Sequence, residues 1–283
     1  MGENRRGPAV GPTHRFRPAA PALALAVTVL LAALLLASCT LFQEPVDPYV
    51  EIRQSWAPAT SVTDDELGAM PHYSMTVQIN PVARVYTGSL DLDLTISSTL
   101  PLQELYFRTY PNLQFFGGSL EVTGARVNGK TVNFAPNDSR TAVQVVLTEP
   151  IKSGARAHVW LSYRGKVTHL SQPGEYTIFG QNEDITSLTG FYPILAARRG
   201  EEWALDVPHP QGDVGFHDAA LHNVNLIFPA DQVIVATGTE ITRTTDSLGW
   251  TTARYALGPA REFTTLLSPR FQIMEIESLG TRV

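Results

Sequence analysis

The sequence predicts an all-β protein, an antiparallel sandwich of several packed sheets. Three observations predict it: apolar and polar residues alternate in many short segments, Gly, Pro, Asn and Asp separate these segments, and no sustained helical periodicity follows residue 40. Alternation with period two is the pattern of strands that bury one face, and many short strands are typical of sandwiches. We expect the β domain to cover residues 71–277, followed by a C-terminal tail over 278–283.

The clearest strands lie in the first half of this domain. Residues 73–79 and 90–96 alternate strictly, and Asn128-Gly129 separates two further alternating runs. An Asn-Gly step is the strongest short-range signal of a hairpin, because both central residues of its turn need positive φ. Further strands are expected at 105–107, 120–127, 132–134, 142–147, 157–163, 176–179, 222–228, 233–237, 250–257, 262–267 and 271–276.

Residues 180–218 form a long stretch without regular alternation, in which Phe191-Tyr192-Pro193 stands out. Long loops in compact domains often carry function, so a contact site is expected in this stretch. Large aromatic side chains could line a groove there, but in a sandwich they mostly fill the core, which we favour. The aromatic residues in question are Trp160, Tyr163, Phe179, Phe191, Tyr192 and Trp203.

Residues 1–38 have the order of a bacterial lipoprotein signal peptide. Four arginines precede an uncharged apolar run, and Leu36-Ala37-Ser38-Cys39 resembles the lipobox, in which a cysteine after small residues accepts a diacylglyceryl group. Cys39 is the only cysteine, so no disulfide can form within the chain. We expect lipidated Cys39 to attach the protein to the cell membrane on its extracytoplasmic side.

Residues 39–70 carry three prolines, scattered acidic residues and no periodicity, which predicts a flexible tether. Removal of residues 1–38, with their four Arg and one Glu, changes the formal net charge from −6 to −9. Because such an acidic chain offers no basic stripe to a phosphate backbone, nucleic acid is not expected as a partner.

The order of the β segments resembles the N-terminal domain of the aminopeptidase N family of zinc peptidases, the gluzincins, from about residue 71 to 276. The order of the motifs, rather than any one of them, carries the resemblance. In that family a saddle-shaped β domain packs on a thermolysin-like catalytic domain, so the resemblance implies an all-β fold and a catalytic peptidase chain or domain as partner. The motifs are Tyr73–Pro81, Gly88–Leu94, Leu105–Phe107 with Tyr110, Val127–Gly129, Leu147–Gly154, Val159–Tyr163, Phe191–Pro193, Gly212-Asp213, Pro229, Val235–Gly238 and Ala260–Phe263.

The catalytic motifs of that family are absent from this sequence. Zinc peptidases of this kind take two ligands and a general base from H-E-x-x-H, which does not occur here, and Gly68-Ala-Met70 only echoes the family's substrate-binding strand within the tether. We therefore expect no catalysis and no cofactor in this chain alone, with zinc only in a separate catalytic domain. The resemblance implies that Glu183 or Asp184 could hold a substrate amino terminus; the simpler role is a solvated carboxylate.

Four residues of types that bind metals fall within 14 residues, which could indicate a metal site: His209, Asp213, His217 and His222. Their spacing gives no shared face and no cysteine assists them, so ordinary histidines are favoured and no metal site is expected.

Three functions remain open at this point: a non-catalytic scaffold, one part of a split or truncated zinc aminopeptidase, and an extracytoplasmic lipoprotein that binds peptides or glycans. The first two are preferred jointly, because the resemblance extends over a whole domain.

Overall fold

The structure is a computed structural model that describes residues 47–57, 60–172, 177–274, 277–278 and 281–282. The contacts divide the chain into two units, Met1–Pro48 and Tyr49–Val283. Every described helix and strand lies in the second unit. Cys39 and the lipobox residues Leu36, Ala37 and Ser38 lie outside the described residues.

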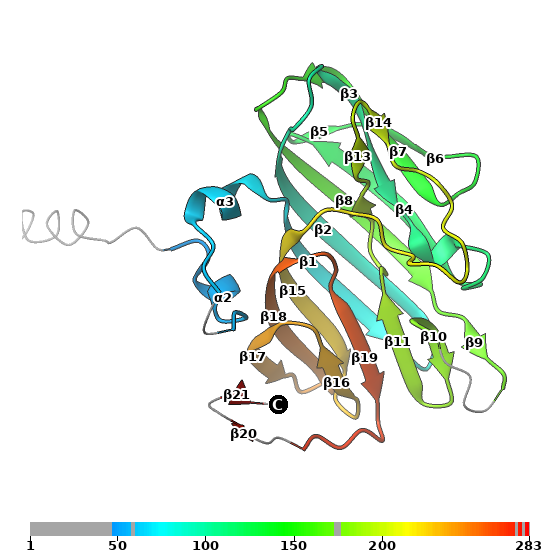
Figure 1. Cartoon of the computed structure of the whole chain (residues 1–283). Coiled ribbons are helices and arrows are strands. Elements are labelled where there is room, and N and C mark those ends of the chain that lie inside the picture. The colour runs from blue at the N-terminus through cyan, green and yellow to red at the C-terminus, as the bar shows by residue number, and fades with distance from the viewer. Residues whose placement is uncertain (1–46, 58–59, 173–176, 275–276, 279–280, 283) are drawn as a thin grey trace, which may run out of the picture. The chain divides into compact units, whose positions relative to one another are not determined.

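An eight-stranded sheet is the main structural element of the domain (Figure 1). Neighbouring strands are antiparallel except the central pair β15 and β1, which run parallel with His72 opposite Leu221. In order across the sheet the strands are β17 (Thr239–Thr245), β18 (Trp250–Ala260), β15 (Ala220–Pro229), β1 (His72–Asn80), β2 (Val85–Thr95), β8 (Arg156–Lys166), β4 (Ser119–Val127) and β5 (Lys130–Thr131).

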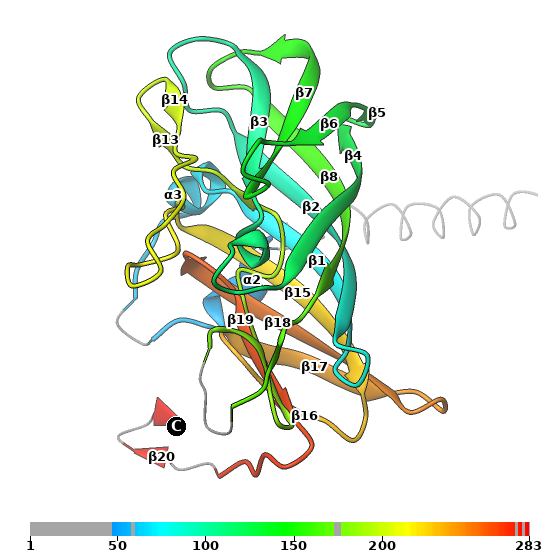
Figure 2. The same ribbon diagram turned by 90° about the vertical axis from the view of Figure 1, so that its right-hand side faces the viewer.

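Two smaller sheets lie against one face of the large sheet (Figures 1 and 2). One contains, in order, β16 (Val233–Ala236), β19 (Thr264–Ser268), β11 (Ile185–Thr189), β10 (Phe179–Asn182) and β9 (His169–Leu170). The other contains β12 (Ile194–Leu195), β3 (Leu102–Arg108), β7 (Ala142–Ile151) and β6 (Asn133–Pro136), and β3 leads into the 3-10 turn η1 (Tyr110–Asn112). Two short pairs are β13 (Arg198–Arg199) with β14 (Glu202–Trp203), and β20 (Glu277–Ser278) with β21 (Thr281–Arg282).

The main core fills the space between the large sheet and the two smaller ones. In β1 every second side chain from Tyr73 to Ile79 is buried, and the same alternation appears in β8. Burial of alternate residues is what a strand with one wet face requires. The predicted all-β, multi-sheet fold is thus confirmed.

The turn chemistry that predicted the first hairpin is also present. Asn128 has φ of 49° and Gly129 has φ of 77°, and they join β4 to β5. Two expectations differ. Residues 239–245 form the edge strand β17, which the sequence did not predict, because its side chains are almost all polar and exposed on both faces. Residues 271–274 of the expected last strand are not in a strand.

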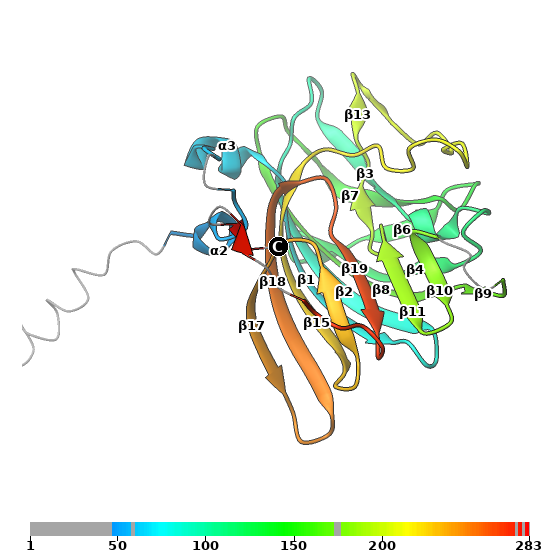
Figure 3. The ribbon, with the colours of Figure 1, turned by 60° about the horizontal axis from the view of Figure 1, so that its bottom comes forward.

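The described residues 49–57 and 60–70, which the sequence assigned to the flexible tether, are packed on the sheet; we call this segment the strap. It contains the helices α2 (Val50–Arg53) and α3 (Asp64–Ala69), and Figure 3 shows both on the side of the large sheet away from the smaller sheets. Ile52 and Leu67 are fully buried in a second apolar cluster. Two helices of four and six residues are too short to produce the periodicity that would have predicted them.

Polar contacts fix the strap in one register on strands β15 and β18. The Glu51 carboxylate lies 2.6 Å from Arg254 Nη2 and accepts a hydrogen bond from Asn223 Nδ2 at 3.1 Å. Trp56 Nε1 donates to the carbonyl oxygen of Gly258 at 2.6 Å. These contacts complete a docked segment that covers the otherwise wet face of the two strands.

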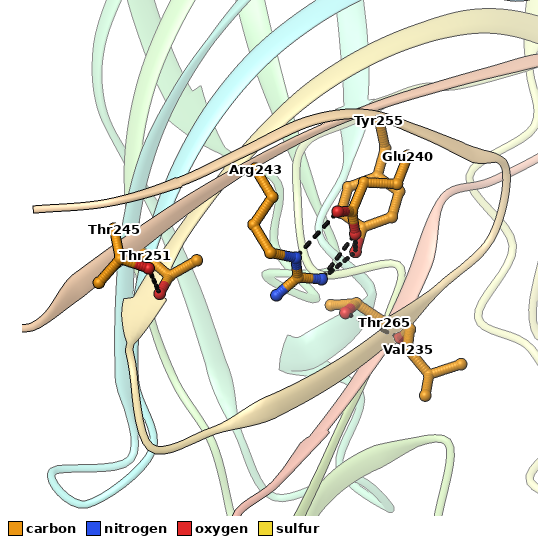
Figure 4. A network of polar contacts seen from close by, with 7 residues as sticks. All are labelled: Val235, Glu240, Arg243, Thr245, Thr251, Tyr255 and Thr265. Atoms are coloured by element: carbon orange, nitrogen blue, oxygen red, sulfur yellow. Dashed lines mark hydrogen bonds and ion pairs between the residues drawn. The ribbon is translucent and has the colours of Figure 1, made fainter. Parts of the chain in front are cut away.

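A second polar network joins β17 to β18 (Figure 4). The Arg243 guanidinium donates to both Glu240 oxygens, at 2.8 and 2.6 Å, and the Tyr255 hydroxyl donates to the same carboxylate at 2.8 Å. These hydrogen bonds hold the pKa of Glu240 below its ordinary value. Thr245 and Thr251 share a further bond of 2.9 Å, so the exposed edge hairpin has internal support.

Candidate functional site

A groove with a volume of about 590 Å³ lies between the strap and the β12 to β14 region. Its floor is apolar, while carboxylates and one guanidinium contribute to its lining. A volume of this size falls within the roughly 300–1,000 Å³ of small-ligand sites. The residues that line the groove include Glu66, Leu105, Arg198, Trp203, Asp218 and Ala219.

Arg198 and Trp203 are brought to the groove by the tight β13–β14 hairpin, in which they are paired. Gly200 allows this turn because its φ is 64°. The Arg198 guanidinium carbon lies 5.0 Å from the centre of the Trp203 ring, and Nη2 donates to the Glu201 carbonyl oxygen at 2.7 Å. Nε of Arg198 is buried and has no hydrogen-bond partner among the described residues.

The chain that follows the hairpin is held down at its first end by Arg108, whose side chain is almost completely buried. Arg108 donates from Nη1 to the Ala204 carbonyl oxygen at 3.2 Å and from Nη2 to that of Asp206 at 3.1 Å. Its guanidinium also lies 5.2 Å from the Tyr110 ring centre. Burial lowers the pKa of Arg108, and the two carbonyl dipoles and the ring compensate part of the cost of desolvating the charge.

The other end of the same segment is held by Tyr110. Its hydroxyl accepts a hydrogen bond from the Phe216 amide at 3.3 Å and lies 3.4 Å from His217 Nδ1. Burial, followed by the charge of Arg261, lowers the pKa of His217. We call residues 204–217 the clamped loop, because both its ends are bound by side chains from the end of β3 and from η1.

The clamped loop presents one apolar side chain to solvent near each of its ends. Val207 is 58% exposed and Phe216 is 50% exposed. The Arg199 guanidinium lies 4.6 Å from the Phe216 ring centre. An apolar pair held on a clamped loop beside a groove is the kind of surface that marks a protein contact.

The Phe191-Tyr192 pair lies in the core, the role that the sequence analysis favoured for these aromatic residues. Both side chains are completely buried, and the Phe191 ring packs edge to face on Tyr86 at 6.0 Å. The stretch is also less irregular than predicted, because β10 to β14 fall within it. Tyr163 and Phe179 are buried too, whereas Trp160 and Trp203 are only partly buried and Trp203 lines the groove.

The two carboxylates proposed for a substrate amino terminus lie at the tip of the β10–β11 hairpin. Glu183 and Asp184 are both more than half exposed, and each lies 2.8 Å from the Arg270 guanidinium. An exposed ion pair of this kind contributes little to stability. In this conformation Arg270 already neutralises part of the charge that a substrate amine would need.

The histidines that suggested a metal site are dispersed. His209 is exposed on the clamped loop, whereas His222 is fully buried, 5.3 Å from the Tyr73 ring and 3.1 Å from the Tyr192 hydroxyl. Burial lowers the pKa of His222 to about 3. No three His, Cys, Asp or Glu side chains of the described residues converge on one point, so these residues do not fit a zinc ion.

Among the helices of the described segments, none is long and apolar enough to cross a membrane.

Arg108 and the groove were not singled out from the sequence, and Tyr110 was noted only as part of the family resemblance. The sequence held one signal for Arg108. This charged residue directly follows the buried Phe107 at the end of a strand that enters a buried turn, and charged residues are seldom found at buried positions unless they are paired. The groove itself leaves no such signal, because its walls come from segments more than a hundred residues apart.

Neither a protein-family model nor a curated protein sequence matches the chain. Solved structures do match, and they place the described chain in a class: it has the fold of the N-terminal β domain of M1 zinc metallopeptidases, the aminopeptidase N family that the sequence resembles. Fold alone does not transfer an activity.

Two of the similar solved structures come from Deinococcus radiodurans. Its M1 zinc metallopeptidase superposes with a TM-score of 0.50 at 19% identity, over 70% of this chain and 41% of that chain. A point mutant bound to a Tyr-Ser-Ala substrate gives 0.52 at 18% identity, over 76% of this chain and 46% of that chain. The chain therefore spans less than half the length of the metallopeptidases it resembles.

Proposed function

We propose that this protein is a lipid-anchored, non-catalytic β module that serves a zinc aminopeptidase as scaffold, or as one part of a split or truncated enzyme. The observation that carries the proposal is a peptidase-type β fold in a sequence that lacks the H-E-x-x-H motif. A catalytic chain or domain would supply zinc and the general base. The clamped loop, with its exposed apolar pair, offers that partner a rigid surface.

The loop proposal predicts the effect of placing charges on it. Val207→Asp combined with Phe216→Asp would bury two carboxylates in the interface, which typically weakens association at least tenfold. We expect the chelator-sensitive release of N-terminal amino acids by membranes of the native host to fall accordingly when the variant replaces the natural chain. Leu248→Asp is the matched control, since Leu248 is 83% exposed on another hairpin. Unchanged peptidase activity after complete removal of the chain would refute the partnership.

The anchor proposal predicts that Cys39→Ala leaves the protein either uncleaved or free of the membrane. The physical reason is the loss of the acyl chains, each CH₂ of which contributes about 0.8 kcal/mol to membrane affinity. Detergent phase partitioning and the mass of the mature protein measure both outcomes. Thr40→Ala is the control and should stay lipidated; normal processing and partitioning of Cys39→Ala would contradict lipidation.

A further inference from the structure

A second hollow, which we call the cleft, lies where β4 of the large sheet faces β6 and β7 of a smaller sheet. Its volume is about 470 Å³, within the roughly 300–1,000 Å³ of small-ligand sites. Leu120 and Val122 of β4 and Val143 of β7 line it with buried side chains. Phe134 of β6 is partly buried and packs against the same core. The floor of the cleft is therefore a hydrocarbon surface.

Two charged residues line the cleft, and only one of them is paired. Glu121 lies 2.8 Å from Arg164 Nη2, so its charge is balanced. The guanidinium of Arg140 makes no hydrogen bond or ion pair within the described residues. Asn112 and Ser139 also belong to the lining, but the Asn112 amide donates to carbonyl groups of β4 and of the β6–β7 turn, and the Ser139 hydroxyl is bonded to a neighbouring threonine. The unbalanced charge of the lining is therefore positive.

The backbone fixes Arg140 at the rim of the cleft. Its φ is 59°, in the left-handed region, which is unfavourable for a residue with a Cβ atom. The turn is closed by the Arg140 amide, which donates to the Asn137 carbonyl oxygen at 2.9 Å, and the Arg140 carbonyl oxygen accepts hydrogen bonds from Thr109 Oγ1 at 3.1 Å and Asn112 Nδ2 at 2.8 Å. A glycine would adopt this conformation without strain, and no contact of the arginine side chain within the described residues offsets the strain. A ligand at the guanidinium would offset it.

We propose that the cleft binds the anion of a medium-chain fatty acid, with its hydrocarbon chain on the apolar floor and its carboxylate at Arg140. A guanidinium pairs with a carboxylate through two parallel hydrogen bonds, and the chain gains free energy for each CH₂ group that leaves water. The charge complementarity of the lining selects an anion over a neutral or cationic ligand. The cleft shares no lining residue with the groove, and binding goes beyond the scaffold role, so its failure would leave the proposed function standing.

The test is equilibrium dialysis of the full chain, reconstituted in lipid nanodiscs, against radiolabelled octanoate and against octanamide at neutral pH. Empty nanodiscs are the blank, because both probes partition into lipid. After subtraction of the blank, octanoate should bind saturably with 1:1 stoichiometry, and the uncharged octanamide should bind at least about tenfold more weakly. Equal binding of the two probes, or no saturable binding of octanoate at millimolar concentration, would overturn the proposal.

Variants of Arg140 separate binding from folding. Arg140→Gly removes the guanidinium and relieves the left-handed backbone, so it should weaken octanoate at least about tenfold without lowering the thermal unfolding temperature. Arg140→Lys keeps the charge and should retain most of the affinity. Arg84→Gly is the matched control, because Arg84 is also exposed, has φ of 55° and lies on another turn. Unchanged octanoate affinity in Arg140→Gly would contradict the assignment of the carboxylate to Arg140.

A third variant connects the binding to the floor of the cleft. Pro136 is exposed, lines the cleft and lies two residues after Phe134 in β6, so the two side chains are on the same side of the strand. Pro136→Trp would fill the cleft and should abolish octanoate binding. Thermal unfolding verifies that this variant is folded, and a folded Pro136→Trp that binds octanoate as tightly as the natural chain would place the fatty acid elsewhere and refute the proposal.

Discussion

Replacing Ile52 and Leu67 by alanine is expected to release the strap from the sheet while the rest of the domain stays folded. Both side chains are fully buried in a cluster of only four buried residues, with Leu221 and Ala256. Truncating a buried Leu or Ile to Ala costs about 2–5 kcal/mol, and the double variant removes both fully buried side chains by which the strap packs on the sheet. The main core lies on the other face of the large sheet and does not depend on these contacts.

Hydrogen exchange measured by mass spectrometry tests this expectation. Since about 1.4 kcal/mol is a factor of ten, exchange of the strap amides should rise at least thirtyfold, while β1 and β8 keep their protection. Val50→Ala is the matched control, because Val50 belongs to the same helix α2 and is 50% exposed. Unchanged exchange over residues 49–70 in the double variant would show that polar contacts alone hold the strap.

The second large effect concerns acid. Burial lowers the folded-state pKa of His222 to about 3, whereas an unfolded histidine titrates near ~6.5. Between these two pKa values the unfolded state binds a proton on His222 that the folded state does not bind. The free energy of unfolding is therefore unaffected by His222 above pH ~6.5 and decreases as the pH falls from there toward about 3. Over that window a single such group reduces the free energy of unfolding by about 1.4 kcal/mol for each pH unit.

His222→Phe should flatten this dependence. Phenylalanine keeps a ring beside Tyr73 but cannot be protonated, and it removes the contact of 3.1 Å with the Tyr192 hydroxyl. We expect a loss of about 1 kcal/mol at neutral pH and a smaller decline between pH 6 and 4 in urea unfolding. His209→Gln, at an exposed histidine, should follow the natural chain. Equal slopes for His222→Phe and the natural chain would contradict the assignment of acid sensitivity to His222.

Local pattern was sufficient to predict most of the large sheet. Strands β1, β2 and β8 alternate strictly because one face is buried, and the Asn128-Gly129 turn needs only two residues to be recognised. The parallel pairing of β1 with β15 could not be predicted in this way, since the two strands are about 150 residues apart and no local turn connects them.

The site was less accessible to prediction for a related reason. The clamped loop depends on Arg108 and Tyr110, which act on carbonyl and amide groups about a hundred residues further along the chain. Nothing in the loop sequence indicates these anchors, because backbone acceptors are the same in every residue. Glu183 and Asp184 were selected only because of their position in the order of the family's motifs. That order contains no information on their contact with Arg270.

The docked strap determines how far the domain can stand from the lipid proposed at Cys39. Only ten residue steps separate Cys39 from Tyr49, and however they are arranged they span at most about 33–36 Å. If the whole segment to Met70 were free, its 31 residue steps would set the limit at roughly 102–112 Å. Loss of a few contacts of Glu51, Ile52 and Leu67 would therefore triple the reach of the module above the bilayer, and with it the set of membrane-bound partners it could meet.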